Sequence, residues 1–346
     1  MFNKKTIIFI ILTVILLIST CSCTSNKSIF SGSTEDFEFT QESVCTNEIS
    51  ENDYPEFFKR AQSTGFTVPA LPQNFVPQGI DFWKEEKVFI ISGYFKPTDY
   101  YEYAVLFAVD AKTGKYVGEW KLMNTDGTPH SGHDGGVAVT PNDIYLSVSY
   151  TLHRISKDQI RKVGNNGNLK FDESIAVPAK ASYANFSQDI LWVGEFSLEG
   201  DPSYTIQGHD YNDNHAWTIG FKLDNDGKIA DKPSYVISTP EKVQGFTMLK
   251  DGRILMTTSF GRTNDSTIYI SKKSILDSPV AMVSVNDEGM GMPLYYTDDY
   301  EKITSIPMNE GVCINGDNVY FICESGANNY AGAKNPTDKI WKFGGF

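Results

Sequence analysis

Gln78-Gly-Ile-Asp-Phe-Trp-Lys-Glu-Glu-Lys-Val-Phe-Ile-Ile-Ser-Gly-Tyr94 carries the local pattern that decides the fold. A polar residue and a glycine lead into a short alternating run, a turn follows, and a longer apolar run ends near an aromatic residue. The pattern recurs, weakly in its third copy, from Gly135-Gly136, Ser182-Tyr183, Gln244-Gly245 and Glu310-Gly311. Counted from residues 79, 136, 182, 245 and 311, the steps are 57, 46, 63 and 66 residues. Repeats of this length built from short β-rich runs predict an all-β radial fold, the β-propeller.

The ends of the chain indicate how the ring closes. A third β-rich run follows every copy and a fourth follows all but the last, because the chain stops at Phe346. The segment Phe66-Thr-Val-Pro69, upstream of the first copy, is left over. We expect it to complete the last blade, since pairing the two ends removes an exposed sheet edge. The sequence thus predicts a five-bladed propeller closed by an N-terminal strand; the alternative is six blades, with a repeat hidden in one of the two longest steps.

Composition limits the classes of partner. With 346 residues, 40% of them hydrophobic, the chain can bury a substantial core. Its net charge of −13 and pI near 4.9 argue against a nucleic-acid partner, because phosphate binding needs a basic face. We expect a monomer with a soluble, solvated surface.

The N-terminus has the features of an export signal. Lys4-Lys5 precede an apolar stretch from Ile7 to Ile18, which is too short for a typical membrane-spanning helix. Residues 1–23 are similar to a bacterial lipoprotein signal, which would place the lipid on Cys21 or, alternatively, Cys23; an uncleaved anchor is the other possibility. We therefore expect an extracytoplasmic protein anchored to the bacterial cell membrane. Residues 24–56 are polar enough to predict a flexible tether, and residues 57–346 form the propeller domain.

Three cysteines remain outside the signal region. Cys45, Cys313 and Cys323 are too few for a disulfide framework, so we expect buried free thiols, with a Cys313–Cys323 bridge as the alternative. If Gly316-Asp317 is the turn of a hairpin, Cys313 faces Tyr320 rather than Cys323.

Propeller geometry turns the repeat into a map of a site. The innermost strand of a blade starts on the face where the second strand ends, so residues at these positions ring one mouth of the channel. The inner ring is Gln78, Asp134, Ser182 or Tyr183, Gln244 and Glu310, and the outer ring is Glu195, Arg262 and Glu324. The loops of this face, 97–103, 130–135, 200–216 and 326–338, hold His130, His133, His209 and His215.

Carboxylates in a partly dehydrated channel can have pKa values suited to proton transfer. Glu310 and Glu195 are therefore the candidate catalytic residues if the protein is an enzyme. The candidate ligand-binding residues are Gln78, His133, Asp134, Gln244, Arg262 and Glu324. Both sets also have a purely structural interpretation. The glutamines can form polar contacts between neighbouring blades, and Glu310 and Glu324 can be a solvated pair at the rim of the channel.

No cofactor is firmly indicated by the sequence. His130-Ser-Gly-His133 has a spacing seen in metal sites but lacks a helix or a clear third ligand, which disfavours zinc. A Ca²⁺ ion held by Asp134, Glu195 and Glu310 suits the preference of that ion for hard oxygen ligands better.

The first copy, Phe75-Val-Pro-Gln-Gly-Ile80 through Ser92-Gly-Tyr94 to Val109-Asp-Ala-Lys-Thr-Gly114, resembles the opening blade of the glutamine cyclotransferase family of bacteria and plants. That family is a five-bladed propeller that converts N-terminal glutamine to pyroglutamate. The resemblance implies that Glu310 or Glu195 is a proton shuttle and that channel glutamines orient the substrate amide. Lactonase-like propellers, which hold a channel metal with carboxylates and Asn, are a second analogy.

Two hypotheses follow for function. The first is a lipid-anchored propeller that binds a small molecule, peptide or glycan at its loop-rich mouth. The second is a propeller enzyme, glutamine cyclotransferase-like or lactonase-like, that uses the channel carboxylates of the same mouth.

Overall fold

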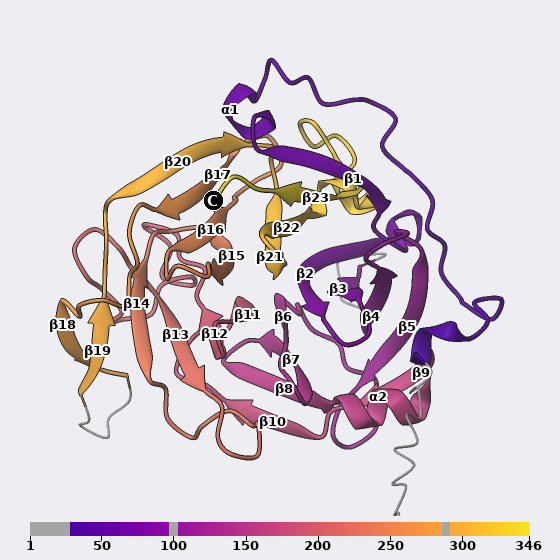
Figure 1. Cartoon of the computed structure of the whole chain (residues 1–346), viewed down its shortest axis with the longest axis horizontal. Coiled ribbons are helices and arrows are strands. Elements are labelled where there is room, and N and C mark those ends of the chain that lie inside the picture. The colour runs from indigo at the N-terminus through magenta and orange to yellow at the C-terminus, as the bar shows by residue number, and fades with distance from the viewer. Residues whose placement is uncertain (1–27, 97–102, 286–290) are drawn as a thin grey trace, which may run out of the picture.

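Five sheets are arranged radially about one axis, as a five-bladed β-propeller (Figure 1). The structure is a computed structural model that describes residues 28–96, 103–285 and 291–346. The expected signal, the two candidate lipidation sites Cys21 and Cys23, and most of loop 97–103 lie outside these residues. No helix within the described ranges is long and apolar enough to cross a membrane.

Each blade is an antiparallel sheet that starts at the axis. The first blade holds β2 (Phe75–Trp83), β3 (Val88–Phe95), β4 (Tyr103–Asp110) and β5 (Tyr116–Met123), and the second holds β6 (Gly136–Val139), β7 (Asp143–Val148), β8 (Thr151–Ser156) and β10 (Glu173–Ala176). The third holds β11 (Tyr183–Ser187), β12 (Ile190–Gly194), β13 (Ala216–Lys222) and β14 (Tyr235–Thr239), and the fourth holds β15 (Val243–Met248), β16 (Ile254–Thr258), β17 (Ser266–Ser271) and β20 (Tyr300–Ser305). The fifth holds β21 (Asn309–Asn315), β22 (Asn318–Cys323), β23 (Lys339–Phe343) and β1 (Ala61–Thr67).

The ring closes in the fifth blade, where the N-terminal strand pairs with the C-terminal one. β1 runs antiparallel to β23, with Ala61 opposite Phe343 and Thr67 opposite Lys339. The backbone N–H of Val68 adds a bond of 2.8 Å to the carbonyl of Asp338. The predicted closure of the ring by the segment at residues 66–69 is confirmed. The strand that closes it, β1, begins at Ala61, several residues before that segment.

The six-blade alternative is wrong, because the extra residues of the two longest repeat steps form a loop and a hairpin instead of another blade. The 63-residue step contains a long loop, residues 195–215, between β12 and β13 of the third blade. The 66-residue step contains the hairpin of β18 (Ala281–Ser284) and β19 (Gly291–Tyr295), which leaves the fourth blade and pairs in parallel with β14. A further parallel strand, β9 (Asn166–Lys170), follows α2 (Lys157–Val163) and widens the first blade beside β5.

Close packing at the axis explains the glycines of the repeat. A Cβ atom on Gly311 would lie 2.7 Å from the Cα of Gly79 in the next blade, and one on Gly79 would lie 2.6 Å from the backbone N of Val137. A Cβ on Gly136 would come within 2.3 Å of the backbone N of Ala184. Adjacent inner strands therefore approach so closely that these positions have no room for a side chain.

The described part of the expected tether lies against the outside of the propeller (Figure 1). After the short helix η1 (Ile29–Ser31), Phe39 is buried and its ring stacks on Phe95 at 4.8 Å between centroids. Tyr54, just before α1 (Pro55–Phe58), donates a 2.7 Å hydrogen bond to Asp265. The composition of residues 24–56 is polar on average, but single aromatic side chains spaced along it fill gaps between blades.

The cysteines of the described chain agree with the sequence-based expectation of free thiols. Cys45, Cys313 and Cys323 form no disulfide, and Cys313 is paired with Tyr320 across the hairpin as predicted.

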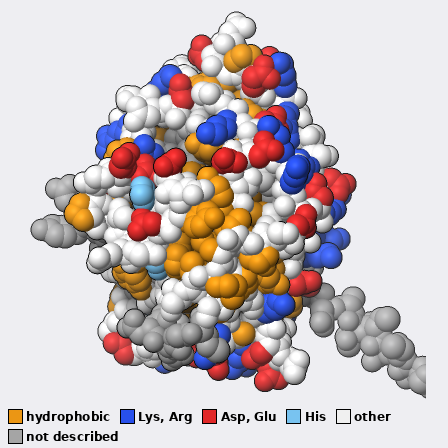
Figure 2. Space-filling view, turned by 90° about the vertical axis from the view of Figure 1, so that its left-hand side faces the viewer, with side chains coloured by type: hydrophobic (Ala, Val, Ile, Leu, Met, Phe, Trp, Pro, Cys, Tyr) orange, Lys and Arg blue, Asp and Glu red, His pale blue; other side chains and the backbone are white. Residues whose placement is uncertain are grey.

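The hairpin β18–β19 lies on the side of the molecule seen in Figure 2, where hydrophobic side chains gather. Val280 and Met282 are among the exposed apolar residues there.

Candidate functional site

One mouth of the propeller axis opens into a cavity of about 540 Å³, here called the mouth cavity. It is lined by residues at the starts of inner strands, at the ends of second strands and in the loops after them. These are the positions that the repeat predicted to ring one mouth of the channel. Four of the predicted ligand-binding residues line it: His133, Gln244, Arg262 and Glu324. The short helices η3 (Glu324–Gly326) and η4 (Asn328–Tyr330) bring Tyr330 to its wall.

Two neighbouring carboxyl groups of the fifth blade, the half-buried Glu324 in the wall of the mouth cavity and the buried Glu310 behind it, form the chemical centre of the mouth. Glu324 follows β22 and accepts a 2.9 Å hydrogen bond from Nε2 of Gln78 and another from the hydroxyl of Tyr330. Burial raises the pKa of Glu324 to about 7, although the hydrogen bonds from Gln78 and Tyr330 lower it.

Glu310 lies in β21 and is 1% exposed. Its Oε1 is buried without a hydrogen-bond partner in the described part of the chain. Burial first, and then the charge of Glu324, raise its pKa well above the usual range of a glutamic acid. Two neighbouring carboxyls that resist losing both protons can serve as one acid and one base.

Aromatic and basic side chains surround this pair. The guanidinium of Arg262 lies 5.0 Å from the ring centroid of Tyr330, whose hydroxyl is also hydrogen-bonded to Tyr94. The ring of Tyr94 in turn lies 4.8 Å from that of His133. The side chain of His133 is exposed at the mouth. The mouth therefore combines hydrogen-bonding groups with flat apolar surfaces.

Glu195, the second candidate catalytic residue, holds a loop in place. It is buried, and one of its oxygens lies 2.8 Å from Nδ1 of His209 while the other accepts from the backbone N–H of Trp217 at 2.9 Å. The ring of His209 stacks on that of Trp217 at 4.0 Å. Glu195 begins loop 195–215, and its two oxygens are engaged by His209 within the loop and by Trp217 in β13, so it anchors this loop.

Asp134 and His130 contact each other and do not line the mouth cavity. Nε2 of His130 lies 3.2 Å from Oδ1 of Asp134, and its Nδ1 lies 2.9 Å from the side-chain oxygen of Asn124. His130 is thus engaged while His133 lines the mouth. In the described ranges no three His, Cys, Asp or Glu residues are grouped so that they could hold a metal ion. The set Asp134, Glu195 and Glu310 is accordingly not brought together.

The inner ring is completed differently in the third blade. Ser182 lines the mouth cavity, whereas the ring of Tyr183 occupies the space above Gly194, where a Cβ would come within 1.9 Å of it. The hydroxyl of Tyr183 lies 2.6 Å from that of Thr218. Of the two alternatives at this position, Ser182 is therefore the one that faces the mouth.

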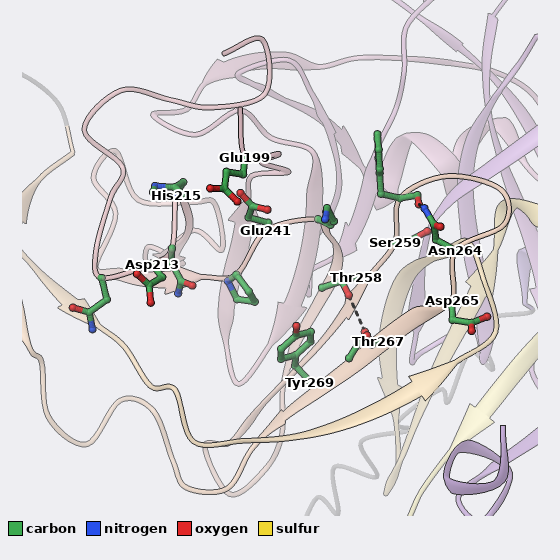
Figure 3. Close-up of a pocket in the computed structure, with 15 residues that line it drawn as sticks. Glu199, Asp213, His215, Glu241, Thr258, Ser259, Asn264, Asp265, Thr267 and Tyr269 are labelled. Atoms are coloured by element: carbon green, nitrogen blue, oxygen red, sulfur yellow. Dashed lines mark hydrogen bonds between the residues drawn. The ribbon is translucent and has the colours of Figure 1, made fainter. Parts of the chain in front are cut away.

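Sequence reasoning missed a second, larger cavity on the same face. This side cavity has a volume of about 730 Å³ and lies between the third and fourth blades (Figure 3). Its walls come from loop 195–215, the β14–β15 connection and the residues after β16, including Glu199, Asp213, His215, Glu241 and Asp265. It shares Ser259 and Phe260 with the mouth cavity. The only sequence signal was the density of polar residues in loop 200–216.

Comparisons with known proteins found distant similarity to solved structures. No protein family model matches it, and no curated protein matches its sequence. Among solved structures, the PQQ-bound aldose sugar dehydrogenase of Streptomyces coelicolor is 15% identical with a TM-score of 0.45, over 82% of this chain and 97% of that one. The glutaminyl cyclase of Myxococcus xanthus is 8% identical with a TM-score of 0.42, over 82% and 94% of the two chains. Likenesses at this level carry no information on substrate or cofactor.

Proposed function

We propose that this chain is an extracytoplasmic enzyme that binds the end of a small polar molecule or peptide in the mouth cavity and moves protons with Glu310 and Glu324. One observation carries the proposal: Glu324 lines the mouth cavity, and beside it the carboxyl of Glu310 is buried with no partner for Oε1 in the described part of the chain. A buried polar atom without a partner is costly, so a site that retains one commonly does so for function.

Acid–base chemistry suits the arrangement. The pair disfavours the state in which both carboxyls are charged, so near neutral pH one can donate a proton while the other accepts one. Gln78 and Tyr330 fix Glu324 through hydrogen bonds. These hydrogen bonds favour the charged form of Glu324, which lines the mouth cavity, so Glu324 is the group that takes a proton from a substrate. Glu310 beside it is the group that keeps a proton to donate.

Glutamine cyclisation is the first reaction to test. In it the α-amino nitrogen of an N-terminal glutamine bonds to the side-chain amide carbon, the bond from that carbon to the amide nitrogen breaks, and ammonia leaves. The attacking amine loses a proton and the departing nitrogen gains one, which requires a base and an acid at one site. The resemblance of residues 75–114 to the glutamine cyclotransferase family supports this choice, because Gln78 of that segment is hydrogen-bonded to Glu324.

Ligand binding without turnover is the second candidate. It is favoured by the hydrogen bonds that occupy Glu324, which a purely structural carboxyl would also make. An anchor on Cys21 or Cys23 would hold either kind of protein at the outer surface of the membrane. Export and lipid attachment are proposed from the sequence of residues 1–23 alone.

Release of ammonia and formation of pyroglutamate from a Gln-initiated peptide test the proposal. We expect turnover by the wild type and a loss of at least about a hundredfold in kcat for Glu310→Gln, with peptide binding retained. Glu195→Gln would loosen a loop, so Glu48→Gln, at an exposed glutamate outside both cavities, is the matched control. Binding with no turnover would make the protein a binding module, and equal turnover by wild type and Glu310→Gln would overturn the role of Glu310.

A further inference from the structure

The mouth cavity and the side cavity meet at a row of aromatic rings. Phe260, 45% exposed, lines both cavities, and its ring lies 6.1 Å from that of Phe196. The ring of Phe196 lies 5.2 Å from that of Tyr204, and both residues line the mouth cavity. A ligand seated at the carboxyl pair therefore has an apolar path into the side cavity, which is the larger of the two.

The side cavity differs from the mouth in charge. The side chains in its walls include four carboxylates, Glu199, Asp213, Glu241 and Asp265, against the ammonium group of Lys242 and the imidazole of His215. Asp265 is engaged by Tyr54 and Lys334. Figure 3 shows Glu199, Glu241 and His215 at one end of the cavity and Asp265 at the other.

Two observations favour a positive group at this end. Oε1 of Glu241 is buried and has no hydrogen-bond partner within the described residues, so it lacks the donor that a buried carboxylate oxygen needs. Glu199, Asp213 and Glu241 outnumber Lys242 in the walls, so the local potential is negative where the cavity is open. In keeping with this, the pKa of His215 is raised, chiefly by its hydrogen bond to Asp210 and also by the charges of Glu241 and Glu199.

We propose that the side cavity is a second subsite, which takes a basic side chain of a peptide whose N-terminal end lies in the mouth cavity. The proposal rests on the proposed function for the choice of a peptide. Glu241 and Glu199 receive the ammonium or guanidinium group, and Phe260 packs against the stretch of chain between the two subsites. The protein would then select peptides with lysine or arginine shortly after their first residue.

Binding of two short peptides tests this subsite directly. The probes are Gln-Lys-Lys-Lys amide and Gln-Gln-Gln-Gln amide, titrated calorimetrically at physiological salt, where screening removes most long-range attraction. We expect the basic peptide to bind about tenfold more tightly to the wild type, and the two to bind within about twofold of each other to Glu199→Gln/Glu241→Gln. The single variant Glu199→Gln, at an exposed position that is safe for folding, should lose part of the preference.

Asp231→Asn is the matched control for net charge. Asp231 is exposed in the β13–β14 connection, on the opposite face from loop 195–215, so its neutralisation should leave the preference for the basic peptide intact. Equal binding of the two peptides to the wild type would overturn the subsite, as would a preference that survives in Glu199→Gln/Glu241→Gln or drops equally in Asp231→Asn.

Turnover measured on the same two peptides separates the two proposals. A basic preference in binding without pyroglutamate formation would overturn the proposed cyclisation and support the subsite. Turnover of both peptides with equal binding would support the enzyme and overturn the subsite.

Discussion

Gln78 in the first blade donates a 2.9 Å hydrogen bond to Oε2 of Glu324, which ends the second strand of the last blade, 246 residues away in sequence. The bond crosses the junction between the first and fifth blades. It links the glycine-marked repeat at one end of the chain to the carboxyl pair at the other. The first blade thus supplies a hydrogen-bond donor to a carboxyl of the blade that closes the ring.

Removing this hydrogen bond should raise the pKa of Glu324 above its value of about 7, because the bond favours the charged carboxylate. Gln78→Met keeps the length of the side chain and removes the donor. Titration of the glutamate carboxyl carbons by NMR measures the change. Gln244→Met, at the corresponding position of the fourth blade and in the wall of the same cavity, is the control and should leave that titration unchanged.

Stability should depend on pH through the same group. Because the pKa of Glu324 is raised from 4.5 to about 7 by folding, the folded state binds more protons between these values. Its contribution is complete below pH 4.5 and is lost as pH rises through about 7. Between pH 5 and pH 8 the free energy of unfolding should thus fall more in the wild type than in Glu324→Gln, by about 1 kcal/mol or more, measured by urea denaturation. An identical fall in the two proteins would show that Glu324 titrates normally.

The inner ring should not tolerate a single added methyl group. In Gly311→Ala the new Cβ would lie 2.7 to 2.8 Å from backbone atoms of Gln78, Gly79 and Ile80, which cannot move independently of the first blade. We expect a loss of about 2 kcal/mol or more in thermal or chemical unfolding. In Gly32→Ala, an exposed control, the nearest atoms are 3.4 Å away and stability should change little.

The segment before the first blade should contribute to stability through its aromatic residues. Phe39 is buried against Phe95 and Phe107, so Phe39→Ala should cost about 3 kcal/mol in the free energy of unfolding. Val44→Ala, at a 40% exposed position in the same segment, should change stability by less than about 0.5 kcal/mol. A loss in Phe39→Ala no larger than that in Val44→Ala would mean that the segment does not hold to the propeller in solution.

The parts of the fold that sequence could predict are those fixed by backbone sterics. Gly79, Gly245 and Gly311 recur because inner strands meet at the axis, and the leftover segment near Thr67 had one free edge to pair with. These constraints act at every repeat, so they leave a periodic trace in the sequence. The positions of Gln78 and Glu310, both buried beside Glu324, follow from the same period.

The side-chain partners that decide the site leave no such trace. Asp134 was placed at the mouth by its position before a strand, but the nearby His130 offered it a hydrogen bond within the second blade. Glu195 was expected at the rim, and the fold of loop 195–215 brings His209 and the backbone of Trp217 to it instead. The side cavity likewise arises from how this loop packs beside the fourth blade. Sequence spacing constrains none of these contacts.

Infrared spectroscopy of the carboxyl groups tests the central claim, that Glu310 and Glu324 form a pair that keeps a proton near neutral pH. We expect a band of protonated carboxyl that persists at pH 6 in the wild type, titrates near pH 7 or above, and changes when either Glu324 or Glu310 is replaced by Gln. A wild-type spectrum with no protonated carboxyl at pH 6, or a band that stays as in the wild type in both Glu324→Gln and Glu310→Gln, would contradict the account.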